Sequence, residues 1–221
     1  IRRAIAVTRP GLYEYSLEAA ARAWFDWSGA DGVAFPAIVA SGPNALTWHY
    51  AANSRQLEAD DLVVMDFGAD MGHLTIDVTR TWPVDGEFSE LELRAYRCVL
   101  EAEKAIIAAM RPGATRKDTV EVEKAILEKW GFADQRAGGA GHFVGMAVHD
   151  VGDEAAPFAP GMVIAVEPMI MIDDKELHCR IEDTVLITGD GAEILTVGLP
   201  REVDELLALV GSASPAAGVL P

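Results

Sequence analysis

Two aspartates interrupt a segment that otherwise has the pattern of a β-hairpin. Residues 62–81 contain two apolar runs around a turn, and Asp66 and Asp77 lie within them. If the turn is centred between Met71 and Gly72, the numbers of paired residues add to 143, and the two aspartates lie directly opposite each other. Opposed residues have Cβ atoms roughly 4.5–5.5 Å apart. Two carboxylates at that distance repel, so a shared proton, a nearby arginine or bound metal ions must compensate.

Further side chains that can bind metals occur at or within other apolar strands. His142 follows a glycine-rich run, Glu167 ends an apolar segment just before a proline, and Glu182 interrupts the apolar run LHCRIEDTVLIT. Four carboxylates and one imidazole suit two divalent ions held about 3.5–4 Å apart. The alternative for the hairpin is a solvated face that carries both aspartates. Arg80 is near in sequence but points to the opposite face of a regular strand.

The surrounding pattern predicts the elements that must hold these side chains. Helices are expected at 16–29, 89–110, 115–130 and 201–210, with Ser16, Ser89 and Thr115 as N-caps and Gly29 after the first helix. Strands are expected at 162–170, 178–188 and 192–197, besides the hairpin. Antiparallel strand pairs and paired helices indicate an α+β fold, and their order recurs in both halves, as in an internal duplication. Residues 211–221 are expected to fray.

Composition limits the classes of function. The 221 residues include 35 acidic and 18 basic side chains, for a net charge of −17, which argues against nucleic acid or an anionic membrane as a partner. No apolar run is long enough to span a membrane, and no signal peptide is visible. Cys98 and Cys179 have no metal-type spacing, which favours a reduced, cytoplasmic protein. The first residue, Ile1, is consistent with an excised fragment.

Five segments together resemble the pita-bread metallopeptidases, and within them the Xaa-Pro aminopeptidases and prolidases. They are ASGPNALTWHYAANS (40–54), LVVMDFGADMGHLTIDVTRTWPVDGEFS (62–89), GHFVGMAVHDVGD (141–153), PGMVIAVEPMI (160–170) and RIEDTVLIT (180–188). The motif DVTRTWPVDGEFS, the pair HY and the run HDVG favour the proline-specific branch over methionine aminopeptidases. The resemblance implies a curved, mostly antiparallel sheet with helices on its outer face and a pseudo-twofold internal duplication.

The resemblance also implies a ligand set. Its members are Asp66, Asp77, His142, Glu167 and Glu182. Asp77 and Glu182 would bridge two divalent ions. Mn²⁺ is the expected metal because most of these ligands are oxygens, with Co²⁺ or Zn²⁺ able to substitute. Glu167 is the expected general base.

The resemblance also bears on the expected roles of four further positions. His49 matches the histidine that faces the substrate, His149 the one that contacts the peptide carbonyl, and Arg180 the arginine that supports the cluster. Proline-specific members usually carry another histidine four residues before the ligand histidine, and this chain has Gly138 there. Residues 1–221 are expected to form one catalytic domain, without the N-terminal domain that most proline-specific members carry.

The expected activity is therefore hydrolysis of the bond before proline in Xaa-Pro peptides or dipeptides, and a homodimer is one expected assembly. The alternatives are a pita-bread pseudo-enzyme that binds peptides or proteins, an aminopeptidase of other specificity such as methionine, a metal-free hydrolase of the creatinase kind, and an acidic structural protein. Pseudo-enzymes lose metal ligands, whereas this sequence retains all of them. Metal content of the purified chain separates the metalloenzyme from the metal-free alternatives.

Overall fold

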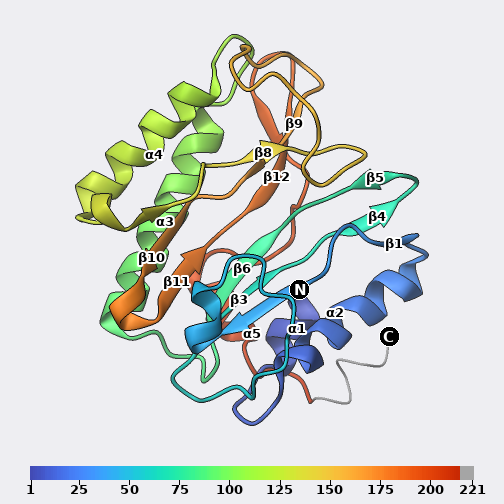
Figure 1. Ribbon diagram of the computed structural model, residues 1–221, viewed down its shortest axis with the longest axis vertical. Coiled ribbons are helices and arrows are strands. Elements are labelled where there is room, and N and C mark those ends of the chain that lie inside the picture. The colour runs from blue at the N-terminus through green and yellow to red at the C-terminus, as the bar shows by residue number, and fades with distance from the viewer. Residues whose placement is uncertain (215–221) are drawn as a thin grey trace.

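The computed structural model describes residues 1–214 and has the predicted α+β composition (Figure 1). The helices are α1 (Arg2–Val7), α2 (Glu14–Ser28), α3 (Glu90–Ala109), α4 (Arg116–Trp130) and α5 (Val203–Leu209), with 3₁₀ turns η1 (Gly42–Leu46), η2 (Ala133–Gln135) and η3 (Asp173–Lys175). No helix within residues 1–214 is long and apolar enough to cross a membrane. Residues 215–221 of the expected tail lie outside the described part.

The strands form antiparallel sheets whose arrangement repeats. In the first half they are β1 (Gly32–Val33), β2 (Ile38–Ser41), β3 (Leu62–Asp66), β4 (Ala69–Met71), β5 (Leu74–Thr75) and β6 (Thr79–Pro83). In the second half they are β7 (Arg136–Ala137), β8 (His142–Phe143), β9 (Val163–Val166), β10 (Met169–Ile172), β11 (Leu177–Arg180), β12 (Asp183–Ile187) and β13 (Ala192–Ile194). The strand order β2-β3-β6 in one half matches β8-β9-β12 in the other.

The repeat places the acids at equivalent points. β3 ends at Asp66 and β9 ends just before Glu167, and each is followed by a hairpin, β4–β5 or β10–β11. Asp77 precedes the returning strand β6, and Glu182 precedes the returning strand β12. The two long strands expected at 162–170 and 178–188 are therefore each broken in two, and the breaks coincide with Glu167 and Glu182. The last predicted strand is shorter than expected and ends at Ile194.

Helix ends test the capping predictions. Ser89 and Thr115 are the N-caps of α3 and α4, as predicted, each with a complete capping box, and Gly29 ends α2 in the left-handed conformation. The prediction for Ser16 is wrong, because α2 already begins at Glu14. The buried Glu14 carboxylate accepts hydrogen bonds from the Ser41 backbone N–H and hydroxyl, both at 2.8 Å, so tertiary contacts fix this helix start.

The predicted hairpin register is also wrong, by one residue pair. The paired residues of β3 with β6 and of β4 with β5 have numbers that add to 145, and Asp66 lies opposite Thr79 rather than Asp77. The reason is the turn, whose two central residues are Gly72 and His73, with φ of 63° and 64°. A two-residue turn of this kind needs positive φ at both positions, which glycine supplies freely and histidine tolerates better than most residues.

Strand alternation separates the two faces of the sheet. The odd-numbered β3 residues Val63 and Met65 belong to the main core, which also contains apolar side chains of α1, α2 and α3. The even-numbered Val64 and Asp66 point to the other face, because successive side chains of a strand alternate. Helices therefore cover the outer face of the sheet (Figure 1), and the Asp66 side chain points to the inner one.

Candidate metal centre

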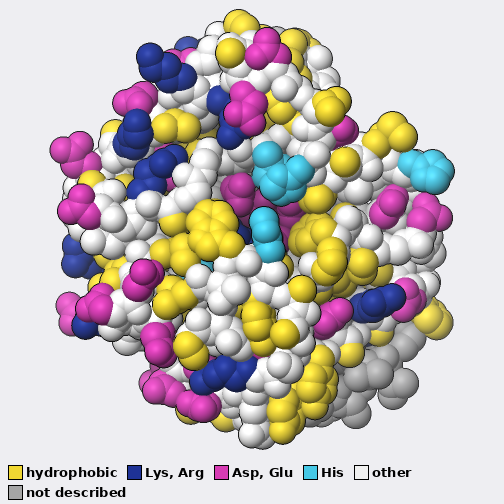
Figure 2. Space-filling view, viewed as in Figure 1, with side chains coloured by type: hydrophobic (Ala, Val, Ile, Leu, Met, Phe, Trp, Pro, Cys, Tyr) yellow, Lys and Arg dark blue, Asp and Glu magenta, His cyan; other side chains and the backbone are white. Residues whose placement is uncertain are grey.

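Acidic and histidine side chains from both halves meet on the inner face of the sheet. Six residues form three overlapping groups of potential metal ligands, and within each group the ligand atoms lie within 4.8 Å of one another. The groups are Asp66, Asp77 and Glu182; His142, Glu167 and Glu182; and Asp77, His142 and His149. Figure 2 shows histidine and acidic side chains together in the hollow at the centre of this face. The structure thus brings together all five residues predicted as metal ligands.

Hydrogen bonds between the starts of β6 and β12 hold the two acids expected to bridge the ions. The Thr184 hydroxyl accepts from the Asp77 N–H at 3.1 Å and donates to the Asp77 carbonyl at 2.6 Å. The Glu182 N–H in turn donates to the Thr79 carbonyl at 3.1 Å. Asp77 and Glu182 therefore keep a fixed separation although neither lies inside a strand.

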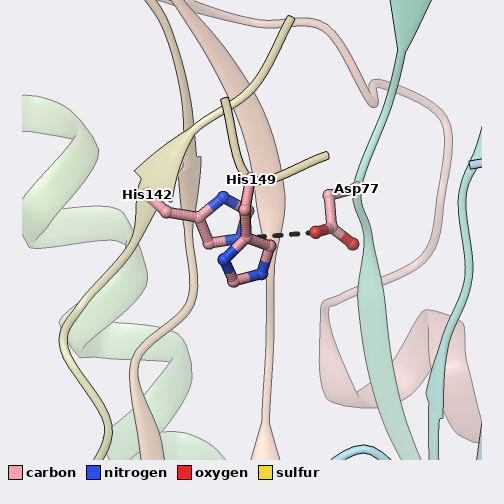
Figure 3. A group of neighbouring side chains, drawn as sticks. All are labelled: Asp77, His142 and His149. Atoms are coloured by element: carbon pink, nitrogen blue, oxygen red, sulfur yellow. Dashed lines mark ion pairs between the residues drawn. The ribbon is translucent and has the colours of Figure 1, made fainter. Parts of the chain in front are cut away.

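His142 presents one nitrogen to the acids. Its Nδ1 lies 3.1 Å from the Phe143 carbonyl oxygen, which can only accept, so Nδ1 carries a hydrogen. Nε2 lies 3.4 Å from Asp77 Oδ2 (Figure 3), and it lies 3.9 Å from Glu182 Oε1 and 4.0 Å from Glu167 Oε1. A histidine that donates from one nitrogen to a carbonyl and directs the other at carboxylates has the arrangement of a metal ligand.

Arg180 is the cation that compensates part of the acidic charge. Its Nη2 donates to Asp66 Oδ2 at 2.7 Å, and its Nε donates to the Thr79 hydroxyl at 3.0 Å. Thr79 then donates to Glu182 Oε2 at 2.7 Å, so it orients two members of the cluster at once. Sequence reasoning missed Thr79. The signal was available, because Thr79 lies two residues after Asp77 and two-residue spacing places side chains on one face.

Arg180 does not compensate all of the negative charge on the carboxyl groups of the cluster. Burial, followed by repulsion from Glu182 and Asp66, raises the pKa of Asp77 to about 11. Burial, followed by repulsion from Asp66 and Glu167, raises the pKa of Glu182 well above its usual range. Among the described residues, one carboxylate oxygen each of Asp66, Asp77 and Glu182 is buried without a hydrogen-bond partner. Unpaired buried oxygens beside an imidazole are the donor set that divalent cations take, so the residues present fit a metal centre.

The two outer histidines lie at the entrance. The rings of His149 and His142 are stacked, with centroids 3.8 Å apart and planes inclined by 14° (Figure 3). Burial and then the charge of His142 lower the pKa of His149. His49 is exposed and adopts a φ of 53°, a left-handed conformation that is uncommon for non-glycine residues. Both histidines can therefore offer hydrogen bonds to a molecule that enters the hollow.

Comparisons with known proteins agree with this geometry. A model of metallopeptidase family M24 matches residues 1–189. The Xaa-Pro aminopeptidase of Haemophilus influenzae is 32% identical, over 92% of this chain and 54% of that protein. The Xaa-Pro dipeptidase of Pyrococcus furiosus is 37% identical, over 89% of this chain and 57% of that protein.

Solved structures extend the likeness to the fold. The structure of proline aminopeptidase P II from Yersinia pestis superposes with a TM-score of 0.88 and 31% identity, over 94% of this chain and 55% of that one. The predicted pita-bread fold is thereby confirmed. The chain spans about half the length of the relatives that it matches.

Proposed function

The chain belongs to metallopeptidase family M24, and on this premise we propose that it removes the first residue from peptides whose second residue is proline. The family relation supports hydrolysis of a peptide bond. The proline specificity is supported by the names of the relatives, which are Xaa-Pro aminopeptidases and an Xaa-Pro dipeptidase. Because the chain spans about half of their length, the activity of the whole protein is part of the proposal.

The observation that carries the proposal is the group of buried carboxylate oxygens around His142 Nε2. Asp66, Asp77, His142, Glu167 and Glu182 would hold two divalent ions, with Asp77 and Glu182 shared between them. Mn²⁺ suits this oxygen-rich set best, while Co²⁺ and Zn²⁺ accept similar ligands. When bound, two such ions would activate a water molecule near neutral pH and polarise the scissile carbonyl.

The protein's own residues supply proton transfer and orientation. Glu167 is the general base, because its carboxylate lies 4.0 Å from His142 Nε2 in the cluster and can reach a water molecule held there. His49 and His149 donate hydrogen bonds to the substrate carbonyl and to the developing oxyanion. Arg180 acts indirectly, since its hydrogen bonds fix the orientation of Asp66 and Thr79.

Proline imposes a particular form of recognition. Its nitrogen has no hydrogen to donate once it is part of a peptide bond, so the site must recognise the ring by shape and the bond by its carbonyl. The substrates are therefore peptides with proline in second position. The predictions of a homodimer and of a cytoplasmic location stay predictions.

The test combines metal analysis with a peptide panel. The protein is stripped with a chelator, reconstituted with Mn²⁺ and assayed on Ala-Pro-Ala, Ala-Pro, Ala-Ala-Ala and Met-Ala-Ala. We expect about two ions per chain, as a two-metal site requires, and fastest cleavage of an Ala-Pro substrate. Best cleavage of Met-Ala-Ala would contradict the proline specificity alone. Two bound ions without cleavage of any peptide would favour the peptide-binding alternative.

A further inference from the structure

Gly138 marks a place beside the metal centre that other side chains already fill. It adopts a φ of 69°, and a methyl group on it would lie 2.9 Å from Met169 Cε, 3.3 Å from Met169 Sδ and 3.3 Å from Trp48 Cη2. The first distance is shorter than van der Waals contact allows. The indole and the thioether thus close over the Gly138 backbone and form what we call the Trp48–Met169 wall.

Sheet register places this wall at the edge of the acidic cluster. Met169 lies two residues after Glu167 and pairs with Ala137 on one side and with Arg180 on the other. Arg180 donates to Asp66, and Gly138 lies four residues before His142. Met169 is therefore held between β7 and β11, and its partner on β11 is Arg180, which contacts the acidic cluster.

The segment that carries Trp48 is anchored to β11, yet half of the Trp48 side chain is exposed. The Ala45 carbonyl oxygen, in the 3₁₀ turn just before Trp48, lies 2.7 Å from Nδ1 of the buried His178 on β11. A small cavity between this segment and β11 is lined by Trp48, His49, His178 and Arg180, among others. Yet 51% of the Trp48 surface remains exposed, whereas Met169 is fully buried. The indole offers a free face next to His49, the histidine at the entrance.

We propose that the free face of Trp48, backed by Met169 and Gly138, binds the proline ring that follows the scissile bond and thereby sets the specificity for proline. This inference rests on the proposed function. The ligand residues of the centre are charged or imidazole side chains, which suit a metal and a carbonyl but not an aliphatic ring. A rigid aromatic face is a surface that proteins use for proline rings, because the ring is compact, apolar and already restricted in conformation.

The test compares Trp48→Ala and Trp48→Phe in the Mn²⁺-reconstituted protein. Trp48→Ala is expected to lower kcat/KM for Ala-Pro-Ala by about 10–100-fold, the range for losing one large apolar contact, and to change Ala-Ala-Ala much less. Trp48→Phe retains an aromatic face and should keep most of the preference. Trp27→Ala removes an indole that is 67% exposed on α2 and serves as the matched control.

Equal loss with both peptides would overturn the proposal, since a merely structural role moves both alike. The proposal would also be overturned if the loss of kcat/KM in Trp48→Ala differed between Ala-Pro-Ala and Leu-Pro-Ala, which differ only in the first residue. Binding of the dipeptide Pro-Ala against Ala-Ala, measured by calorimetry, separates this inference from the proposed function. If the parent protein cleaves nothing, the proposed function fails, but weaker Pro-Ala binding by Trp48→Ala alone still supports the wall. Unchanged Pro-Ala binding refutes it.

Discussion

Two consecutive residues, Glu182 and Asp183, belong to two buried clusters of opposite design. Glu182 points into the acidic cluster, where Arg180 is the cation that donates directly to a carboxylate. Asp183 points to the other face of β12, where Arg80 Nη2 donates to it at 2.8 Å and Arg201 Nη1 donates to it at 3.0 Å. Both carboxylates are 1% exposed, so burial does not distinguish them. Their partners do.

The network around Asp183 combines two arginines with two carboxyl groups, and burial raises the pKa of one of these, Glu103, to about 8. Arg80 and Arg201 face Asp183 and Glu103, and Arg201 Nη1 donates to Glu103 Oε1 at 2.6 Å. Burial alone would raise the pKa of Asp183, but Arg80 and hydrogen bonds to Asp183 lower it overall. Arg80 also donates to the Glu182 carbonyl at 2.7 Å and so ties the network to the metal centre.

The difference shows how to separate a structural cluster of charges from a functional one. Buried ions persist in a fold when opposite charges and hydrogen bonds satisfy them, as around Asp183. The acidic cluster lacks that compensation within the described residues, so its carboxyl groups must be neutral or bind cations. The predictions below test this contrast, beginning with the largest expected effect.

Asp183→Asn should lower the free energy of unfolding, because Asp183 is the centre of the charged network. Removing this carboxylate takes away the group to which Arg80 and Arg201 both donate, and breaking a buried pair costs about 3–5 kcal/mol of stability. Urea denaturation of the metal-free protein measures the loss. Asp174→Asn is the control, because Asp174 is exposed and should change stability by less than about 0.5 kcal/mol. Similar values for both variants would mean that the network contributes little.

Glu182→Gln should act on metal binding rather than on the fold. A shared ligand serves both ions, so its loss should remove more than half of the bound Mn²⁺. Peptidase activity should fall further than the about 10–100-fold that follows when a ligand loses its outer partner. Atomic emission and the Ala-Pro-Ala assay measure the two effects. Full metal content in Glu182→Gln would exclude Glu182 as a shared ligand.

The same Glu182→Gln change should stabilise the metal-free protein. It removes one of the repelling carboxylates while Thr79 can still donate to the amide oxygen, and replacing buried charge by neutral groups can add about 1–4 kcal/mol. Chelation should correspondingly lower the melting temperature of the parent protein, and added Mn²⁺ should restore it. A metal-free variant that melts below the metal-free parent would contradict the repulsion inferred for the cluster.

Local sequence signals predicted much of this contrast. Ser89 and Thr115 were predicted as N-caps, and the structure adds that each forms a capping box with the residue three positions later. The members of the acidic cluster followed from acids within apolar strands and from motif order. The register of the hairpin did not follow, because either Met71 or Gly72 could begin a two-residue turn, and the choice moves every pair by one position.

Contacts between residues far apart in the sequence could not be predicted from the sequence alone. Arg80 and Asp183 are 103 positions apart, and Trp48 lies over Gly138 only after both halves of the sheet have formed. Neither pair has a local signature. The prediction that Arg80 faces away from Asp66 was as far as alternation along a strand could lead. What Arg80 contacts instead depends on β12, which sequence alone could not place.

His178 extends the contrast to a buried base. Burial, followed by the charge of Arg180, lowers its pKa to about 3, so it stays neutral in the fold as the unpaired acids do. The unfolded chain protonates this residue near pH 6.5. The contribution of neutral His178 to the free energy of unfolding is therefore fully present above pH 6.5, and it is lost as the pH falls from there toward about 3.

The loss caused by His178 should reach at most about 1.4 kcal/mol per pH unit, the value for one proton bound only by the unfolded state. His178→Gln keeps a donor for the Ala45 carbonyl but does not titrate, so stability of the metal-free variant should depend less on pH between 6.5 and 4. His73→Gln, at the exposed tip of the β4–β5 hairpin, is the matched control. Urea denaturation at several pH values measures the slope. Equal slopes for parent and His178→Gln would show that His178 is not held neutral. The contrast between paired and unpaired burial would then be restricted to the carboxylates, since an imidazole that protonates inside the fold must find a partner there.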